Sequence, residues 1–195
     1  MFYLFPRIVK PYVCEAIIKD CMNRNLEPAK VTNIDNSSAR DDPNIRKTSI
    51  YFVPTDRNNK ANKIAWHFLK EANKEMFHYD LTYFQQIQFS VYKDGGFFDW
   101  HTDSYHQDQP NKTRKLSLSL VLSNPNTFEG GKLEFYNGGR SWEEKGDATG
   151  EQIKMDLESQ GTVVVFDSRD YHRVTPVTDG VRHSIVCWAT GAAFR

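Results

Sequence analysis

The chain has 195 residues, and its 25 lysines and arginines balance its 25 aspartates and glutamates. This length suits one domain with a substantial core, and a net charge of zero gives no electrostatic reason to expect nucleic acid or an anionic membrane as a partner. No apolar run is long enough to span a bilayer, and the run over residues 1–5 is too short for a signal peptide. Three cysteines without CxxC spacing predict neither disulfides nor a zinc site, so we expect a soluble chain in a reducing, cytoplasmic compartment.

The first 80 or so residues are predicted to form a helical support. Pro11 suits a first helical turn, and apolar residues recur at helical spacing as far as Met22. Residues 33–45 are rich in Asn, Asp and Ser, which indicates a loop, and residues 46–54 predict a strand. Residues 58–77 predict a second helix, whose apolar face comprises Ile64, Phe68, Leu69, Ala72 and Met76.

From about residue 83 to residue 190 the pattern is one of short strands separated by glycine turns. Polar and apolar residues alternate over residues 86–92 and again over 115–123, and two further apolar strands are predicted over 161–166 and 181–189. Many short strands after two helices predict a mainly β fold of the α+β class. We expect a β-sandwich or jelly roll with the helices packed on one sheet, in a single domain over residues 1–195.

Two histidines and an aspartate form the strongest candidate site. His101 and Asp103 would share a face if a strand continues through both, and His172 follows the buried strand over 161–166. Two histidines and a carboxylate are the ligands of the facial triad that holds non-haem Fe(II) and leaves coordination positions open. Arg182 lies ten residues beyond His172, and its guanidinium could bind a carboxylate through two parallel hydrogen bonds. Alone, a His-x-Asp pair is equally typical of polar residues at the end of a strand.

The order of several motifs resembles that of the prolyl-hydroxylase branch of the Fe(II)/2-oxoglutarate-dependent dioxygenases, from about residue 86 to residue 188. Residues 92–103 resemble the family's tyrosine, glycine turn and His-x-Asp motif, and residues 128–133 resemble its double-glycine turn. The resemblance implies a double-stranded β-helix in which His101, Asp103 and His172 ligate iron. It also implies that Arg182 pairs with the distal carboxylate of 2-oxoglutarate, at a position where many prolyl hydroxylases have lysine.

Three further residues are candidates for contact with the co-substrate. Ser184 lies two residues beyond Arg182 and shares its face of the strand, while Tyr92 and Ser117 lie on earlier strands. Ordinary strand hydroxyls and a core tyrosine are the competing interpretations.

The resemblance implies a reaction in which O2 and 2-oxoglutarate are consumed, succinate and CO2 are released, and an unactivated C–H bond is hydroxylated. Ascorbate is a further candidate cofactor. A prolyl residue of a peptide or protein is the first choice of substrate, and a free amino acid or small metabolite is the alternative. Nucleic-acid dealkylation is disfavoured because Trp188 occupies the position of that branch's second arginine. A non-catalytic β-roll binding module is the remaining alternative, and we expect a monomer or weak homo-oligomer.

Two polar segments, residues 33–46 and 104–114, are candidates to cover the mouth of the site. Arg46, Trp100, Tyr105 and Asp99 are hypotheses for substrate contact, against a competing role in surface or rim packing. In a regular strand Asp99 would share the face of the triad. The other histidines are expected to be structural: His67 and His78 at the surface, His106 in a loop, and His183 pointing away from Arg182.

Overall fold

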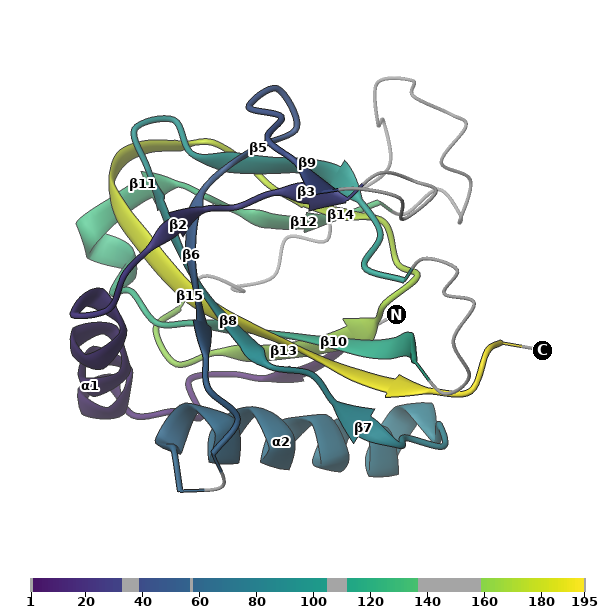
Figure 1. Cartoon of the computed structure of the whole chain (residues 1–195). Helices are drawn as coiled ribbons and strands as arrows, with labels where there is room; N and C mark the ends of the chain where they lie inside the picture. The colour runs from purple at the N-terminus through teal and green to yellow at the C-terminus, as the bar shows by residue number, and fades with distance from the viewer. Residues whose placement is uncertain (1, 33–38, 57, 105–111, 137–158, 195) are drawn as a thin grey trace.

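The structure is a computed structural model that describes residues 2–32, 39–56, 58–104, 112–136 and 159–194. Two antiparallel sheets lie opposite each other and form a jelly roll, which confirms the predicted fold class (Figure 1). The larger sheet runs in the order β1 (Phe2–Phe5), β13 (Val163–Asp167), β10 (Thr113–Val121), β15 (Val177–Gly191), β8 (Ile87–Lys93), β6 (Ser49–Val53) and β2 (Glu27–Pro28). Two short strands, β7 (Tyr83–Phe84) and β11 (Phe128–Gly130), also pair with β15.

The smaller sheet faces the larger one across the interior of the roll (Figure 1). Its order is β12 (Leu133–Phe135), β14 (His172–Val174), β9 (Phe97–His101) and β5 (Arg46–Lys47). A separate hairpin pairs β3 (Val31–Thr32) with β4 (Ala39–Arg40), and a short 3-10 helix, η2 (Pro125–Thr127), precedes β11.

Two helices lie on the side of the larger sheet that faces away from the roll (Figure 1). Helix α1 (Pro11–Met22) begins at a proline, as predicted. Helix α2 (Lys60–Ala72) is capped by the Asn59 side chain, which accepts hydrogen bonds from two backbone amides, and it continues as a π-helix, η1 (Asn73–Phe77). No helix within the described residues is long and apolar enough to cross a membrane.

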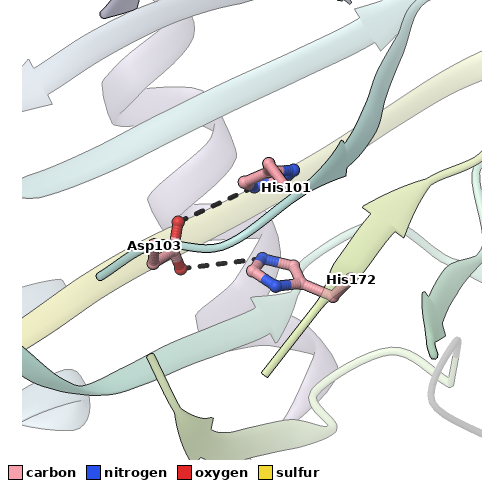
Figure 2. Close-up of side chains that lie close together, drawn as sticks. All are labelled: His101, Asp103 and His172. Atoms are coloured by element: carbon pink, nitrogen blue, oxygen red, sulfur yellow. Dashed lines mark ion pairs between the residues drawn. The ribbon is translucent and has the colours of Figure 1, made fainter. Parts of the chain in front are cut away.

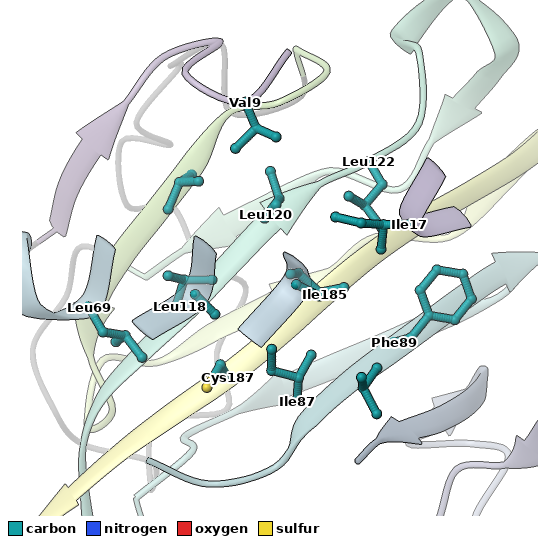
Figure 3. Close-up of a cluster of buried hydrophobic side chains, with 14 of the residues drawn as sticks. Val9, Ile17, Leu69, Ile87, Phe89, Leu118, Leu120, Leu122, Ile185 and Cys187 are labelled. Atoms are coloured by element: carbon teal, nitrogen blue, oxygen red, sulfur yellow. The ribbon is translucent and has the colours of Figure 1, made fainter. Parts of the chain in front are cut away.

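Strict alternation along β10 separates two faces of the larger sheet. Leu116, Leu118 and Leu120 are fully buried towards the helices, whereas Ser117 and Ser119 occupy the opposite face. The leucines join a helix-side core, in which each fully buried large aliphatic side chain contributes about 1.5–3 kcal/mol. Figure 3 shows part of this core, including Val9, Ile17, Leu69, Ile87, Phe89, Leu118, Leu120, Leu122, Ile185 and Cys187.

A second apolar cluster lies between the two sheets. This inter-sheet core comprises Tyr92, Phe128, Leu133, Phe135, Val164, Phe166, Val174 and Val177. The His172 ring contacts it, at 4.7 Å between ring centroids from Phe166. The candidate site is therefore built against an apolar wall inside the roll.

The N-terminal region contributes more β structure than its sequence predicted. Strand β1 pairs with β13, with Phe2 opposite Phe166, and β5 and β6 belong to different sheets. Strand β4 lies inside residues 33–45, which were predicted to be a loop, and it pairs with β3 just before them. Strands of two to five residues carry too little periodicity to be recognised, and long-range pairing decides their conformation.

Candidate active site

The three triad residues converge in space although 69 residues separate Asp103 from His172. One ligand atom from each of His101, Asp103 and His172 can be chosen so that all three lie within 4.8 Å of one another. Figure 2 shows the carboxylate of Asp103 facing both rings, with Nε2 of His101 at 3.7 Å from one oxygen and Nε2 of His172 at 3.6 Å from the other. His101 ends β9 and His172 begins β14, and the two residues lie opposite each other in the smaller sheet.

The hydrogen bonds of the two rings fix which nitrogen is available for a metal. Nδ1 of His101 lies 2.7 Å from the carbonyl oxygen of Asp99, and Nδ1 of His172 lies 2.9 Å from that of Asp170. Because a carbonyl can only accept, each Nδ1 carries the proton and donates it. Both Nε2 lone pairs are then free beside Asp103, which is the usual arrangement of metal-binding histidines.

One turn, residues 167–170, accepts hydrogen bonds from two triad residues, Asp103 and His172. The backbone amide of Asp103 donates to the carbonyl of Ser168 at 2.9 Å, and the carbonyl of Asp170 accepts the hydrogen bond from His172. A displacement of this turn would therefore move two of the three candidate ligands together.

The turn is itself held by a buried polar cluster. The carboxylate of Asp167 accepts from the Tyr79 hydroxyl at 2.6 Å and from Nε of Arg169 at 2.8 Å. Although burial alone would raise it, these partners keep the pKa of Asp167 below its usual value. The Phe194 ring has the Lys115 ammonium at 3.5 Å and the Arg169 guanidinium at 3.7 Å from its centroid. Sequence reasoning missed this cluster, because nothing in the local pattern links residue 79 to residues 167 and 194.

The electrostatic environment favours the deprotonated forms of His101 and Asp103. Burial lowers the pKa of His101, and the neighbouring His172 lowers it further. Burial acts to raise the pKa of Asp103, but the two histidines, Arg114 and a hydrogen bond from Ser117 outweigh it and lower this pKa. Neutral imidazole and ionised carboxylate are the forms that bind metals.

Ser117 forms a hydrogen bond with the carboxylate of Asp103. Its hydroxyl donates to Oδ2 of Asp103 at 2.7 Å and lies 2.9 Å from the hydroxyl of Ser168. The residue is fully buried on the interior face of β10. Its predicted contact with 2-oxoglutarate stays a prediction, whereas its contact with Asp103 gives it a position beside the candidate metal ligands.

An irregularity in β9 interrupts the alternation on which the predicted orientation of Asp99 rests. His101 pairs with His172 and Phe98 with Val174, so β9 has two residues between these pairs where β14 has one. This β-bulge places Phe98 and His101 on the same side, with their rings stacked at 3.5 Å between centroids. Asp99 is exposed, and its contact with substrate stays a prediction.

Trp100 lies on the outer face of the smaller sheet. Its ring stacks on Tyr171 at 5.5 Å between centroids, and the guanidinium of Arg173 lies 4.7 Å from the Trp100 ring. The side chain is therefore packed against neighbours on the side away from His101, as the competing interpretation had it. Tyr105 and His106, and most of the segment 104–114, lie outside the described residues.

Arg182 is buried inside the roll, with 1% of its surface exposed. It lies on β15 opposite Tyr92, whose ring centroid is 5.5 Å from the guanidinium, and its Nη1 donates to the Ser184 hydroxyl at 3.2 Å. Gly131 makes room for it: a Cβ at that position would lie 2.7 Å from Cδ of Arg182. The double-glycine motif and the arginine are thus parts of one local packing arrangement.

The other histidines occupy structural positions. His183 is bonded to the Ser123 hydroxyl and stacks on Phe89 of the helix-side core, on the face opposite to Arg182. His67 and His78 are exposed. These three predictions are confirmed.

A groove beside the triad was not predicted. It has a volume of about 280 Å³ and is lined by Phe52, Tyr83, Gln85, Gln86, Arg114 and Trp188. Arg114 connects it to the triad, since Nη1 donates to the carbonyl of Asp103 at 3.4 Å and the guanidinium lies 3.8 Å from the Trp188 ring centroid. The position of Trp188, six residues beyond Arg182 on the same face of β15, was the available signal for this groove.

Comparison with known proteins places this site in a family. The model of the 2OG-Fe(II) oxygenase superfamily matches residues 87–190, which is more than half of the chain. The chain belongs to this superfamily. The family and the His-Asp-His arrangement together imply Fe(II) and 2-oxoglutarate as the metal and co-substrate.

Curated relatives are similar over about half of the chain. A PKHD-type hydroxylase from Teredinibacter turnerae is 34% identical over 105 residues, which are 52% of this chain and 41% of the relative. A second PKHD-type hydroxylase, from Psychrobacter sp., is 35% identical over 105 residues, which are 51% of this chain and 36% of the relative. The match therefore spans about two fifths of the length of these relatives.

Solved structures share the fold over nearly the whole chain. A prolyl-4-hydroxylase from Pseudomonas putida has a TM-score of 0.70 at 20% identity, with 98% of this chain and 93% of that chain covered. A viral collagen prolyl hydroxylase from Paramecium Bursaria Chlorella virus-1 has a TM-score of 0.71 at 17% identity, with 98% and 96% covered. A prolyl hydroxylase from Trichoplax adhaerens, in complex with a peptide fragment, has a TM-score of 0.65 at 15% identity, with 97% and 83% covered.

Proposed function

We propose that this chain is an Fe(II)- and 2-oxoglutarate-dependent dioxygenase that hydroxylates an unactivated C–H bond and releases succinate and CO2. The convergence of His101, Asp103 and His172 carries the proposal: their ligand atoms lie within 4.8 Å of one another, with both Nε2 lone pairs free. Two neutral imidazoles and one carboxylate are a donor set that suits Fe(II). When bound, the metal would activate O2 and couple its reduction to the oxidation of 2-oxoglutarate.

The protein's own residues would hold and orient these groups. His101, Asp103 and His172 are the proposed ligands, and the backbone carbonyls that accept from Nδ1 would prevent either ring from rotating. Ser117 would keep Asp103 in its orientation through the 2.7 Å hydrogen bond. No side chain is required as a strong general base in this scheme.

Arg182 is the proposed partner of the distal carboxylate of 2-oxoglutarate. Its guanidinium is buried, and a planar fork of N–H donors binds a carboxylate through two parallel hydrogen bonds. Ser184 accepts from Nη1 and would fix the orientation of the fork, while Tyr92 lines the same pocket.

We propose a prolyl residue of a peptide or protein as the substrate. The names of the relatives support this class, and so does the open groove beside Asp103. The aromatic rings of Trp188 and Tyr83 offer apolar surface to a prolyl ring, and Gln85 and Gln86 offer amides to a peptide backbone. The three buried, free cysteines support a reducing compartment, and we propose the cytoplasm.

Succinate formation tests the proposal directly. Protein loaded with Fe(II) without oxygen would receive 2-oxoglutarate and O2, with and without proline-containing peptides and ascorbate, beside a His172→Ala control. We expect peptide-stimulated succinate formation that His172→Ala abolishes. Turnover that depends on His172 but not on peptide would redirect the substrate search to free amino acids and small metabolites. No metal binding and no succinate under any condition would reject the enzyme in favour of a binding module.

An Arg182→Met variant tests the co-substrate pocket in the same assay. Loss of a charge-assisted pair is expected to raise the KM for 2-oxoglutarate about ten- to a hundredfold. A KM equal to that of the unmodified protein would show that the co-substrate carboxylate binds elsewhere.

A further inference from the structure

Arg46 lies in a stack of side chains that ends at a triad residue. Strand β5 pairs with β9 so that Arg46 lies opposite Phe98, and the guanidinium carbon is 4.4 Å from the Phe98 ring centroid. The other neighbour of Phe98 is His101, whose ring is stacked at 3.5 Å between centroids and 16° between planes. The guanidinium therefore faces the interior of the roll on the same side of the sheet as the triad.

This guanidinium is a cation without an anionic partner. Among the described residues Arg46 takes part in no salt bridge, and its Nε is completely buried without a hydrogen-bond partner. Burial lowers the pKa of Arg46, although Tyr92 and Asp103 act in the opposite direction. The carboxylate of Asp103 faces the two histidines and accepts a hydrogen bond from Ser117, and it forms no salt bridge with Arg46. An arginine stays charged in proteins, and burying its charge without a counter-charge is costly.

The outer face of the same sheet provides the comparison. Arg173 also lies over an aromatic ring of β9, at 4.7 Å from the centroid of Trp100, but its Nε donates to the carboxylate of Glu134 at 2.7 Å. Within the described residues, the outward arginine therefore has a carboxylate partner and the inward one has none. The Arg46 guanidinium can therefore bind a carboxylate that comes from outside the chain.

We infer that Arg46 is a second carboxylate-binding residue of the site, and that the carboxylate belongs to the molecule that is hydroxylated. The inference rests on the proposed function, which assigns the distal carboxylate of 2-oxoglutarate to Arg182 and would leave its other carboxylate to the metal. The carboxylate left for Arg46 is then the substrate's: an acidic side chain near the target residue, or a carboxyl terminus. The proposed substrate class is then a prolyl peptide that carries a carboxylate, rather than any prolyl peptide.

A matched peptide panel tests this inference. Pairs of prolyl peptides that differ only as Glu against Gln, or as a free against an amidated carboxyl terminus, would be assayed with the unmodified protein and with Arg46→Met, Arg46→Lys and Arg173→Met. Methionine keeps the apolar contact with Phe98 but removes the charge. We expect the unmodified protein to prefer the anionic member of at least one pair about ten- to a hundredfold in kcat/KM.

Arg46→Met should lose this preference and Arg46→Lys should retain part of it, while Arg173→Met, the control, should behave like the unmodified protein. Equal use of charged and neutral peptides by the unmodified protein, or a preference that survives Arg46→Met, would overturn the inference. If Arg46→Met instead raises the KM for 2-oxoglutarate and leaves peptide discrimination unchanged, the bound carboxylate is the co-substrate's and the assignment to the substrate is wrong.

A binding measurement separates this inference from the activity. Protein loaded with Mn(II) and saturated with 2-oxoglutarate would be titrated with acetate, and the relaxation of the acetate methyl protons by Mn(II) would be followed by NMR. We expect faster relaxation with the unmodified protein and Arg173→Met than with Arg46→Met. Equal relaxation in all three would reject Arg46 as a carboxylate site. Electron paramagnetic resonance of the same samples reports whether Mn(II) is bound, so failure of the proposed metal site is recognised independently.

Discussion

The two sheets of the roll differ in construction. The larger sheet has long strands, up to the 15 residues of β15, and its outward face is sealed by helices over the fully buried leucines of β10. The smaller sheet has strands of two to five residues and a β-bulge, and its outer face carries half-exposed residues such as Trp100 and Arg173. Two of the three triad residues come from the smaller sheet, whereas Arg182, Ser184 and Ser117 come from the larger one.

This difference suggests a division of labour within the molecule. The larger sheet and its helices form the helix-side core, and the larger sheet also carries the residues of the proposed co-substrate pocket. The smaller sheet sets the directions of the two histidine rings. The β-bulge between β9 and β14 changes the direction of side chains in a way that regular pairing cannot. Substitutions in the larger sheet should therefore affect the stability of the fold, and substitutions in the smaller sheet should affect metal binding.

His101→Ala is expected to separate activity from stability most strongly. This variant should lose metal-dependent succinate formation to background, because one of three ligands is gone, while the melting temperature of the metal-free protein shifts by only a few degrees. Activity and thermal unfolding would be measured on the same preparation, with Trp100→Phe on the outer face as the control. A variant that unfolds would contradict the division between the two sheets.

Leu118→Ala in the helix-side core is expected to lower stability while leaving metal affinity unchanged. Leu118 is fully buried and pairs with positions in β13 and β15, so its truncation should lower the free energy of unfolding by about 2–5 kcal/mol. Denaturant titration measures this change, and Tyr12→Ala, at a 71% exposed position, should change it by less than about 0.5 kcal/mol. Below the unfolding transition, metal affinity should match that of the unmodified protein; a large loss would show that the sheets are tightly coupled.

Asp167→Asn probes a place where the larger sheet supports the triad through the turn at residues 167–170. Weakening the bonds from Arg169 and Tyr79 should loosen the turn that holds Asp103 and His172, and reduce metal affinity about ten- to a hundredfold. Titration with Co(II), followed by its visible absorption, measures the affinity. Arg173→Met breaks an ion pair next to His172 without touching the turn, so it should leave the affinity unchanged. Equal losses in both variants would argue for general loosening instead.

The pH dependence of the metal-free protein gives a further test of how the smaller sheet holds His101. Burial and His172 lower the pKa of His101 to about 3, against 6.5 for an unfolded histidine. Below pH 6.5 the unfolded chain takes up a proton that folded His101 does not, so stability should fall as the pH drops from 6.5 towards 3, by up to about 1.4 kcal/mol per pH unit. Above pH 6.5 this contribution should be constant. The slope would be compared with that of His101→Gln, and identical slopes would refute the assignment to His101.

Much of the site was predictable from local pattern. A His-x-Asp pair, a histidine after a buried strand and an arginine ten residues later carry their chemistry in residue type and order, and the structure brings the first three together. Both helices could be predicted because their apolar periodicity and start signals are local properties. The buried and exposed faces of β10 followed from strict alternation along one strand.

Other features depend on contacts that no local pattern encodes. Asp99 was expected to share the face of the triad because a regular strand alternates, but the register between β9 and β14, set by pairing across about 70 residues, introduces a bulge that interrupts this alternation. The turn at residues 167–170 supports the triad through backbone carbonyls, which leave no trace in side-chain identity. The sequence by itself determined which groups could bind a metal and a carboxylate. Only the tertiary structure decided which of two stacked arginines received a carboxylate partner, because that depends on which face of the smaller sheet each side chain occupies.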